Sequence, residues 1–326
     1  MRKDFLNFNL IGGEYPAFET QIRRGTPTAA FGVSGSLKYL LASLLPFPVL
    51  YITKDSISAK KAAENAATLS GKDTTVLTAK DEVLFFRKAL SKESYFKRLN
   101  AIDALKNGCP FVAAEIDAVL QIFPKELPYL NLREGEETDF VSLPEKLCEM
   151  GYARGFEVES KGVFALRGDI LDIFPVNMEN PVRIDFFGDT VEKIKPYDLA
   201  TGERLGNLKT LKILSATDVV IGKDEEEKLF SLLEKETKKF KTTESYERAR
   251  SIVEELTVQT DAEKGFLLPA LKNSTDIFGV LPENTVIVFE ESKEIWDKFN
   301  SLYKEHEERF HRLQTGGEAF DFSFYQ

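Results

Sequence analysis

The sequence has few of the residues that build metal centres and disulfide frameworks. Its 326 residues include two cysteines, Cys109 and Cys148, which lie far apart without the short spacing of metal ligands. The two histidines, His306 and His311, are five residues apart, and this spacing does not place them on one face of a helix. We therefore predict free thiols in a reducing cytosol, surface histidines and no metal site.

Long apolar runs are also missing. No stretch reaches the roughly 18 apolar residues that a membrane helix needs. The N-terminus starts basic but has neither a continuous apolar core nor a small-residue cleavage site, so it does not match a signal peptide. These absences predict a cytoplasmic protein without membrane contact.

Positive charge is in deficit. The chain has 43 Lys and Arg against 53 Asp and Glu, for a net charge of −10. A module that binds nucleic acid broadly needs clustered Lys and Arg to neutralise phosphates, so the acidic balance disfavours that class of function. A local basic patch would still be compatible with it.

What is present is a pattern of alternating strands and helices. At this length the chain suits two or three domains, and the pattern divides it into residues 1–124, 125–213 and 214–326. The first part alternates strands with helices at a spacing that predicts parallel βαβ units. The expected strands of that part are 26–33, 48–53, 74–78 and 111–114. The second part predicts one helix (143–151) against an antiparallel sheet, and the third returns to complete the first domain with charged helices around a strand at 286–289.

The stretch 167–198 carries the clearest strand pattern. Residues 182–187 alternate by period two, which puts Val182, Ile184 and Phe186 on one face. Arg183, Asp185 and Phe187 fall on the other face, at the end of which Gly188–Asp189 predicts a turn into a returning antiparallel strand. An aromatic residue beside an arginine on an exposed face is the composition enriched at interface hot spots. The alternative is that Phe187 packs on a neighbouring element, since single exposed apolar residues are common.

The same stretch resembles the second domain of UvrB and the matching domain of the transcription-repair coupling factor (Mfd) family. The resemblance rests on RGDILDIFP at 167–175 and PVRIDFFGD at 181–189, supported by the Gly151–Tyr152 pair and by GVFA at 162–165. It implies an α/β fold: a degenerate P-loop-type, helicase-like parallel α/β domain with an inserted α+β domain.

The resemblance also implies residues that contact a partner. In the Mfd family the UvrB-like module recruits the repair protein UvrA through the sheet of the second domain. The matching positions are Arg167 and Arg183, expected on adjacent strands, with Phe187 and, on the same face, Asp185. Two guanidinium groups can pair bidentately with acidic side chains, and Phe187 would supply apolar contact area.

A nucleotide-binding loop is present only in degraded form. The segment GVSGSLKY at 32–39 stands where the motif G-x-x-x-x-G-K-[ST] would lie, and aligned to the loop of UvrB it keeps GVSGS, with Gly32 and Gly35, and Lys38. Leu37 replaces a glycine where backbone must approach phosphate, and Tyr39 replaces the hydroxyl residue that would hold Mg²⁺. We interpret the loop as a vestigial nucleotide site without activity.

A second degraded motif follows the strand at 286–289. UvrB-like helicases place an Asp-Glu-Ser-His motif there, and this chain has Glu290 and Glu291 followed by Ser292 and Lys293. A strand that runs into an acidic helix start would give the same residues. The chain also lacks the tyrosine-rich hairpin with which UvrB holds damaged DNA. The aromatics of that region, Phe85, Phe86 and Phe96, are instead predicted to face a core.

These features favour the Mfd family over UvrB and predict no catalytic residues. The chain is expected to be an N-terminal, monomeric part of a larger protein, whose other domains use ATP and Mg²⁺ and contact RNA polymerase and DNA. In that family a C-terminal domain masks the second domain, so this chain alone would expose it. Two alternatives are a divergent UvrB-like ATP-dependent DNA-repair helicase subunit and a nucleic-acid-binding module.

Overall fold

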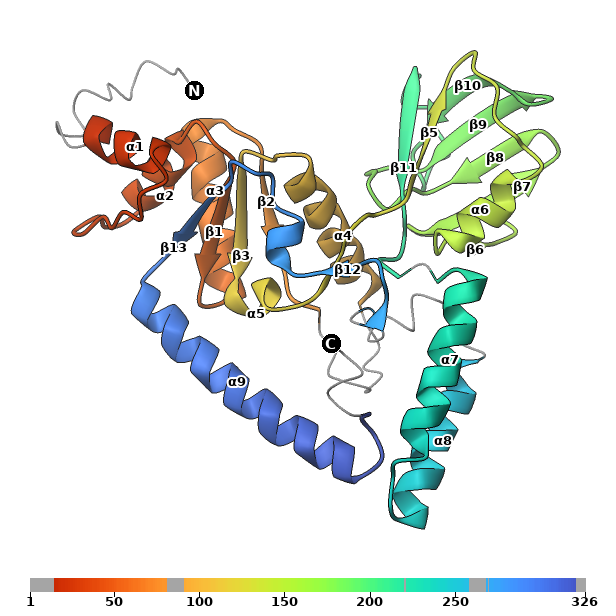
Figure 1. The fold of residues 1–326 in the computed structure, drawn as a ribbon. Helices are drawn as coiled ribbons and strands as arrows, with labels where there is room; N and C mark the ends of the chain where they lie inside the picture. The colour runs from red at the N-terminus through yellow and green to blue at the C-terminus, as the bar shows by residue number, and fades with distance from the viewer. Residues whose placement is uncertain (1–14, 81–90, 220, 258–267, 269, 321–326) are drawn as a thin grey trace.

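A computed structural model describes residues 15–80, 91–219, 221–257, 268 and 270–320. Figure 1 shows a parallel α/β domain, an inserted sheet domain joined to it by two connecting segments, and two projecting helical regions. The mixed α/β class with a parallel sheet, expected from the sequence, is confirmed. Among the described residues no helix combines the length and apolarity needed to cross a bilayer, and no His, Cys, Asp and Glu side chains gather as a metal site would require.

The first domain is a three-layer α/β structure. Its sheet has the order β13-β1-β3-β2, and every pairing is parallel. The strands are β1 (Val49–Thr53), β2 (Thr74–Leu77), β3 (Phe111–Glu115) and β13 (Val286–Phe289). Helices α1 (Tyr15–Arg23), α2 (Leu37–Leu44) and α3 (Ser56–Ser70) cover one face. Helix α4 (Lys92–Lys106) covers the other face, while α5 (Ile116–Val119) and α9 (Ser292–Thr315) follow the carboxyl ends of β3 and β13, where α9 packs on α5.

The prediction of a strand at residues 26–33 is wrong. This segment is irregular, and Phe31 is one of the most exposed large apolar side chains of the described residues. The β-forming composition is interrupted by Pro27, which lacks an N–H donor, and by Gly32 at φ +73°. The degraded nucleotide loop is therefore not preceded by a strand of the sheet.

The inserted domain is a twisted five-stranded sheet with the order β10-β9-β8-β7-β6. All of its pairings are antiparallel except the short parallel β6–β7 contact. The strands are β6 (Ala153–Arg154), β7 (Val163–Arg167), β8 (Ile170–Ile173), β9 (Val182–Phe187) and β10 (Thr190–Pro196). One face packs on α6 (Leu143–Glu149) and on the ribbon of β5 (Tyr129–Arg133) and β11 (Thr210–Leu214). The opposite face is called the outer face below.

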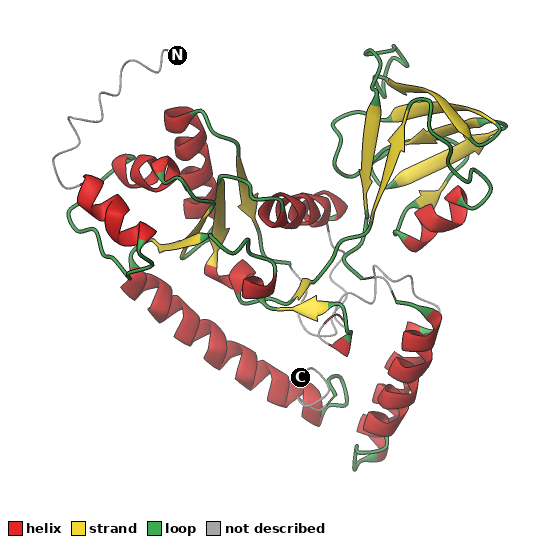
Figure 2. Cartoon of the chain, turned by 45° about the horizontal axis from the view of Figure 1, so that its top comes forward, coloured by secondary structure: helices red, strands yellow, loops and turns green. Residues whose placement is uncertain are grey.

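The remaining elements form a helical projection and a short connection. Helices α7 (Lys223–Thr237) and α8 (Thr243–Leu256) pack side by side and extend away from both sheets (Figure 2). Leu229, Leu233 and Ala249 belong to the separate apolar cluster of this hairpin. The chain then pairs β12 (Ser274–Thr275) with β4 (Phe123–Pro124) and passes through the short helix η4 (Ile277–Gly279) to β13.

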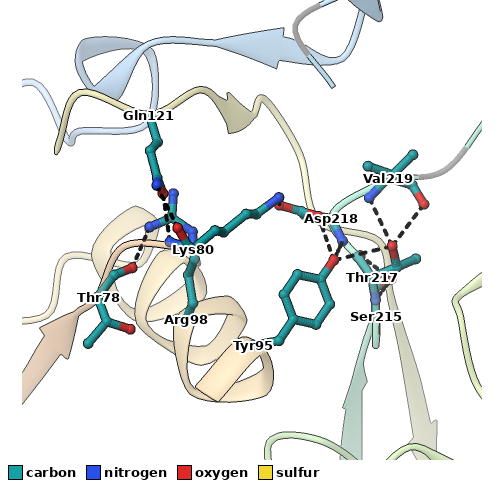
Figure 3. A network of polar contacts seen from close by, with 9 residues as sticks. All are labelled: Thr78, Lys80, Tyr95, Arg98, Gln121, Ser215, Thr217, Asp218 and Val219. Atoms are coloured by element: carbon teal, nitrogen blue, oxygen red, sulfur yellow. Dashed lines mark hydrogen bonds and ion pairs between the residues drawn. The ribbon is translucent and has the colours of Figure 1, made fainter. Parts of the chain in front are cut away.

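Helix α4 is the junction between the two sheet domains. Phe96 lies in the core, as expected, whereas Phe85 and Phe86 lie outside the described residues. The hydroxyl of Tyr95 donates to Asp218 Oδ1 at 2.5 Å, and the backbone N–H of Asp218 donates back to that hydroxyl at 3.0 Å (Figure 3). Lys80 Nζ lies 2.5 Å from Asp218 Oδ2, with both side chains buried. The second connecting segment is thus held to the first domain by a buried ion pair.

Candidate protein-docking face

The outer face of β7, β8, β9 and β10 carries the residues that the sequence singles out. The burial of β9 alternates as expected: Val182, Ile184 and Phe186 are buried, while Arg183 and Phe187 are exposed. This confirms the period-two interpretation, and β10 returns antiparallel after a turn at Gly188, whose φ is +59°. The outer-face residues, here called the docking face, are Arg167, Ile170, Asp172, Arg183, Asp185, Phe187 and Lys195.

The strand register arranges these residues in two rows. One row runs from Arg167 through Ile170 to Asp185. The other runs through Asp172 to Arg183, and Lys195 continues it on β10. Arg167 and Arg183 were expected on adjacent strands, and this is wrong, because β8 lies between β7 and β9. The two arginines therefore sit two strand spacings apart, roughly 10 Å across the sheet.

Arg183 is held by a carboxylate of its own sheet. Its Nε and Nη2 donate to the two carboxylate oxygens of Asp172 at 2.7 and 2.8 Å. The hydrogen bond that the Arg183 guanidinium donates to Asp172 is the largest effect on its pKa and raises it. Asp172 is buried, while the side chain of Arg183 is 45% exposed. The guanidinium also lies over the ring of Tyr197, with Arg183 Cζ 5.7 Å from the centroid of that ring. The fork is fixed in orientation and keeps donors on Nη1 for a partner.

Phe187 has no such packing. Its side chain is 76% exposed at the end of β9, so among the described residues no element covers it. Its neighbour on the inner face, Phe186, is buried and packs 4.6 Å from Phe140, centroid to centroid. The alternative that Phe187 packs on a neighbouring element is not what the structure has.

Two further polar contacts fix the docking face. Arg167 Nη2 donates to the backbone oxygen of Phe156 at 3.0 Å. Asp185 is paired with Lys195 of the neighbouring strand. The charges that remain accessible are therefore held in place by the sheet, which lowers the entropy that a partner must remove on binding.

Two residues of the degraded nucleotide motifs, Lys38 and Glu290, form an ion pair with each other. The ammonium of Lys38 is bonded to Glu290 Oε1, and Tyr39 OH donates to the same oxygen at 3.5 Å. Burial lowers the pKa of Lys38, but hydrogen bonding and charge from Glu290 outweigh it and raise the pKa. Tyr39 is buried and packs edge-on against Tyr51, with centroids 5.6 Å apart. Lys38, the residue that would meet phosphate, is thus paired with the residue that would handle Mg²⁺.

The other motif positions do not join this pair. Gly32, Gly35 and Leu37 lie on an exposed segment at the start of α2. Glu291 is exposed at the start of α9, in a left-handed conformation with φ +53°. In a working site a rigid cradle of backbone N–H groups, set between a strand and a helix, holds the phosphate.

Three contributing residues were not identified from the sequence. Asp172 orients Arg183 because the strand register places the two residues opposite each other. Period-two alternation within β8 indicates that Asp172 faces outward, but it does not indicate its partner. Tyr51 is buried, and its pKa is raised by burial and by Glu290, which comes from a strand far along the chain. Phe156 contacts Arg167 from a loop that has no motif.

Comparison with known proteins finds a family similarity for the inserted domain. Residues 130–218 match the family model of the UvrB interaction domain. This range starts within β5 and ends just after β11, so it contains the docking face. The chain resembles the N-terminal UvrB-like module of transcription-repair-coupling factors.

Individual relatives agree with this. The Bacillus subtilis transcription-repair-coupling factor is 28% identical in an alignment of 306 residues that covers 88% of this chain and 26% of that protein. The Myxococcus xanthus factor is 29% identical in an alignment of 219 residues that covers 62% of this chain and 18% of that protein. UvrABC system protein B of Clostridium botulinum is 40% identical over 108 residues, a third of this chain (33%) and 16% of that protein. The chain spans about a quarter or less of the length of these relatives.

Proposed function

We propose that this chain is a non-catalytic, UvrB-mimicking module that recruits UvrA in transcription-coupled nucleotide excision repair. The proposal draws on the match to a UvrB interaction domain and on the similarity to transcription-repair-coupling factors. Such a role belongs in the cytoplasm. In the whole protein, RNA polymerase and DNA would be contacted by segments other than this chain.

The observation that carries the proposal is the composition of the docking face. Phe187 is exposed on the same face of β9 as Arg183, with Asp185 between them, and two hydrogen bonds to Asp172 fix the orientation of Arg183. A rigid arginine fork and an exposed aromatic side chain on one face of a sheet have the composition and pre-organisation of a binding hot spot. Neither residue belongs to the main apolar core, which packs on the inner face of the sheet.

The role of Arg183 can be tested by titrating UvrA with the wild-type chain and with Arg183→Ala. We expect the variant to bind about 30-fold more weakly, since truncating a central interface arginine costs about 2 kcal/mol. Arg183→Ala also leaves the buried carboxylate of Asp172 without its partner. The matched control is therefore Asp172→Asn/Arg183→Gln, which replaces the ion pair by two amides of similar size.

If Arg183 contacts UvrA, both variants lose affinity, whatever their stability. If the double variant binds UvrA as tightly as the wild type, Arg183 acts only through the fold of the sheet and its assignment as a contact residue is wrong. Circular dichroism at the titration temperature verifies that each variant is folded.

We also propose that the chain uses no nucleotide cofactor and hydrolyses no ATP. The Lys38–Glu290 pair, the exposed glycines and the buried Tyr39 all support this. A working site with ATP at about 100 times its Kd would add about 2.7 kcal/mol to stability. That corresponds to an increase of several degrees in Tm for a chain of this size.

We accordingly expect millimolar MgATP to change the Tm of the chain by less than about 1 °C. The measurement is a thermal melt with and without nucleotide, repeated on Lys38→Ala. A clear rise in Tm that disappears in Lys38→Ala would revive the helicase-subunit alternative.

A further inference from the structure

The most exposed large apolar side chain of the described residues is not part of any motif. Phe156 is 98% exposed, on the loop between β6 and β7. A single exposed apolar residue needs no explanation by itself. Phe156 differs because the loop that carries it is anchored on both sides of Phe156 and is hydrogen-bonded to a docking-face residue.

The first anchor is Gly155. Its backbone N–H donates to the carbonyl of Phe164 at 2.8 Å and so continues the contact with β7. A Cβ at this position would lie 2.9 Å from the backbone oxygen of Glu157 and 3.2 Å from Val163 Cγ1. Only glycine fits this close approach, which turns the chain so that Phe156 projects from the sheet.

The second anchor is Val158, which is buried on the outer face. With Ala165 and Phe174 it forms a small apolar cluster separate from the main core. Phe156 thus sits between a glycine that is tied to β7 and a valine that is packed on the sheet. The remaining contact is the hydrogen bond from Arg167 Nη2 to the Phe156 carbonyl, at 3.0 Å.

This attachment makes Phe156 a neighbour of the docking face. Arg167, Ile170 and Asp185 form one row across the sheet, and Phe187 lies two residues beyond Asp185 on the same face. The loop extends the row by one position beyond β7. Phe156 and Phe187 are therefore about three strand spacings apart, roughly 15 Å, with Arg167 and Asp185 between them.

We infer that Phe156 is a second aromatic anchor of the docking face and inserts into an apolar pocket on UvrA. This inference rests on the proposed function. A partner that covers Arg167 must also meet Phe156, because the two residues are hydrogen-bonded and both point to solvent. The surface that fits has two apolar pockets, one for each phenylalanine, and an acidic group between them facing Arg167.

The test is the affinity of UvrA for Phe156→Ala, measured beside wild type, Phe187→Ala and the control Phe278→Ala. Phe278 is 67% exposed on η4 of the first domain, away from the docking face. We expect Phe156→Ala to bind about tenfold more weakly and Phe278→Ala to bind as the wild type does. The Tm of all three variants should stay close to that of the wild type, because exposed side chains contribute little to stability.

The double variant Phe156→Ala/Phe187→Ala should lose affinity by the product of the two single losses, because sites this far apart contribute additively. If wild type binds and Phe187→Ala weakens binding while Phe156→Ala binds normally, this inference alone is overturned. If wild type does not bind UvrA, the proposed function fails and the inference falls with it.

Discussion

Replacing Phe187 by alanine is expected to weaken UvrA binding about 30-fold while leaving the fold unchanged. The side chain is 76% exposed, so its removal takes almost nothing from the core of the sheet. A central aromatic anchor lost from an interface costs about 2 kcal/mol, which is the stated factor in Kd. The measurement is a calorimetric titration of UvrA with the wild-type and the variant chain.

Two control measurements separate the loss of a direct contact from an indirect effect on the fold. Phe278→Ala removes an equally large exposed aromatic from the first domain and should leave Kd unchanged. The free energy of urea unfolding of Phe187→Ala should lie within about 0.5 kcal/mol of wild type. A Phe187→Ala variant that is as stable as wild type and binds UvrA equally well would remove Phe187 from the interface.

Replacing Asp218 by asparagine is expected to lower the free energy of unfolding by about 3–5 kcal/mol. Lys80 and Asp218 are both buried, and breaking such a pair leaves a charge in a medium that solvates it poorly. The substitution would also change the short hydrogen bond that Tyr95 donates to the carboxylate. The measurement is urea unfolding at pH 7, with Asp73→Asn, which changes an exposed carboxylate, as the matched control.

The same pair gives the expected dependence on pH. Burial raises the pKa of Asp218. The charge of Lys80 and the hydrogen bonds from Lys80 and Tyr95 outweigh burial, so the pKa of Asp218 lies below the ordinary value of 3.8. A carboxyl with a depressed folded pKa stabilises the fold above its unfolded pKa and loses that contribution as pH falls through the folded value. The difference in unfolding free energy between wild type and Asp218→Asn should therefore be full at pH 7 and shrink below about pH 4. A difference that stays constant down to about pH 2 would contradict the ion pair.

The docking-face residues of β9 could be assigned to one side of the sheet from sequence, because alternation within a strand depends only on the neighbours in the chain. The pattern at 182–187 predicts which side chains face outward, and the structure has that arrangement. Pairing between strands depends on register, which no local pattern contains. The bidentate contact between Arg183 and Asp172, and the strand that separates Arg167 from Arg183, could therefore not be predicted.

The error at residues 26–33 has a similar origin. Thr and Val with Phe favour strand locally, but a strand needs a partner edge, and in this chain β13 occupies the position beside β1. In the same way, the replacement of a glycine by Leu37 and of a hydroxyl residue by Tyr39 is visible in the sequence. That Glu290 is the partner of Lys38 is not, because the two lie 252 residues apart.

Hydrogen exchange of the chain with and without UvrA tests the central claim most directly, because protection reports which backbone amides a partner covers or stabilises. We expect added protection in β7 to β10 and in the loop around Phe156, with none around Lys38 and Glu290. Protection confined to the parallel α/β domain, or to the α7–α8 hairpin, with unchanged exchange in residues 155–196, would contradict it.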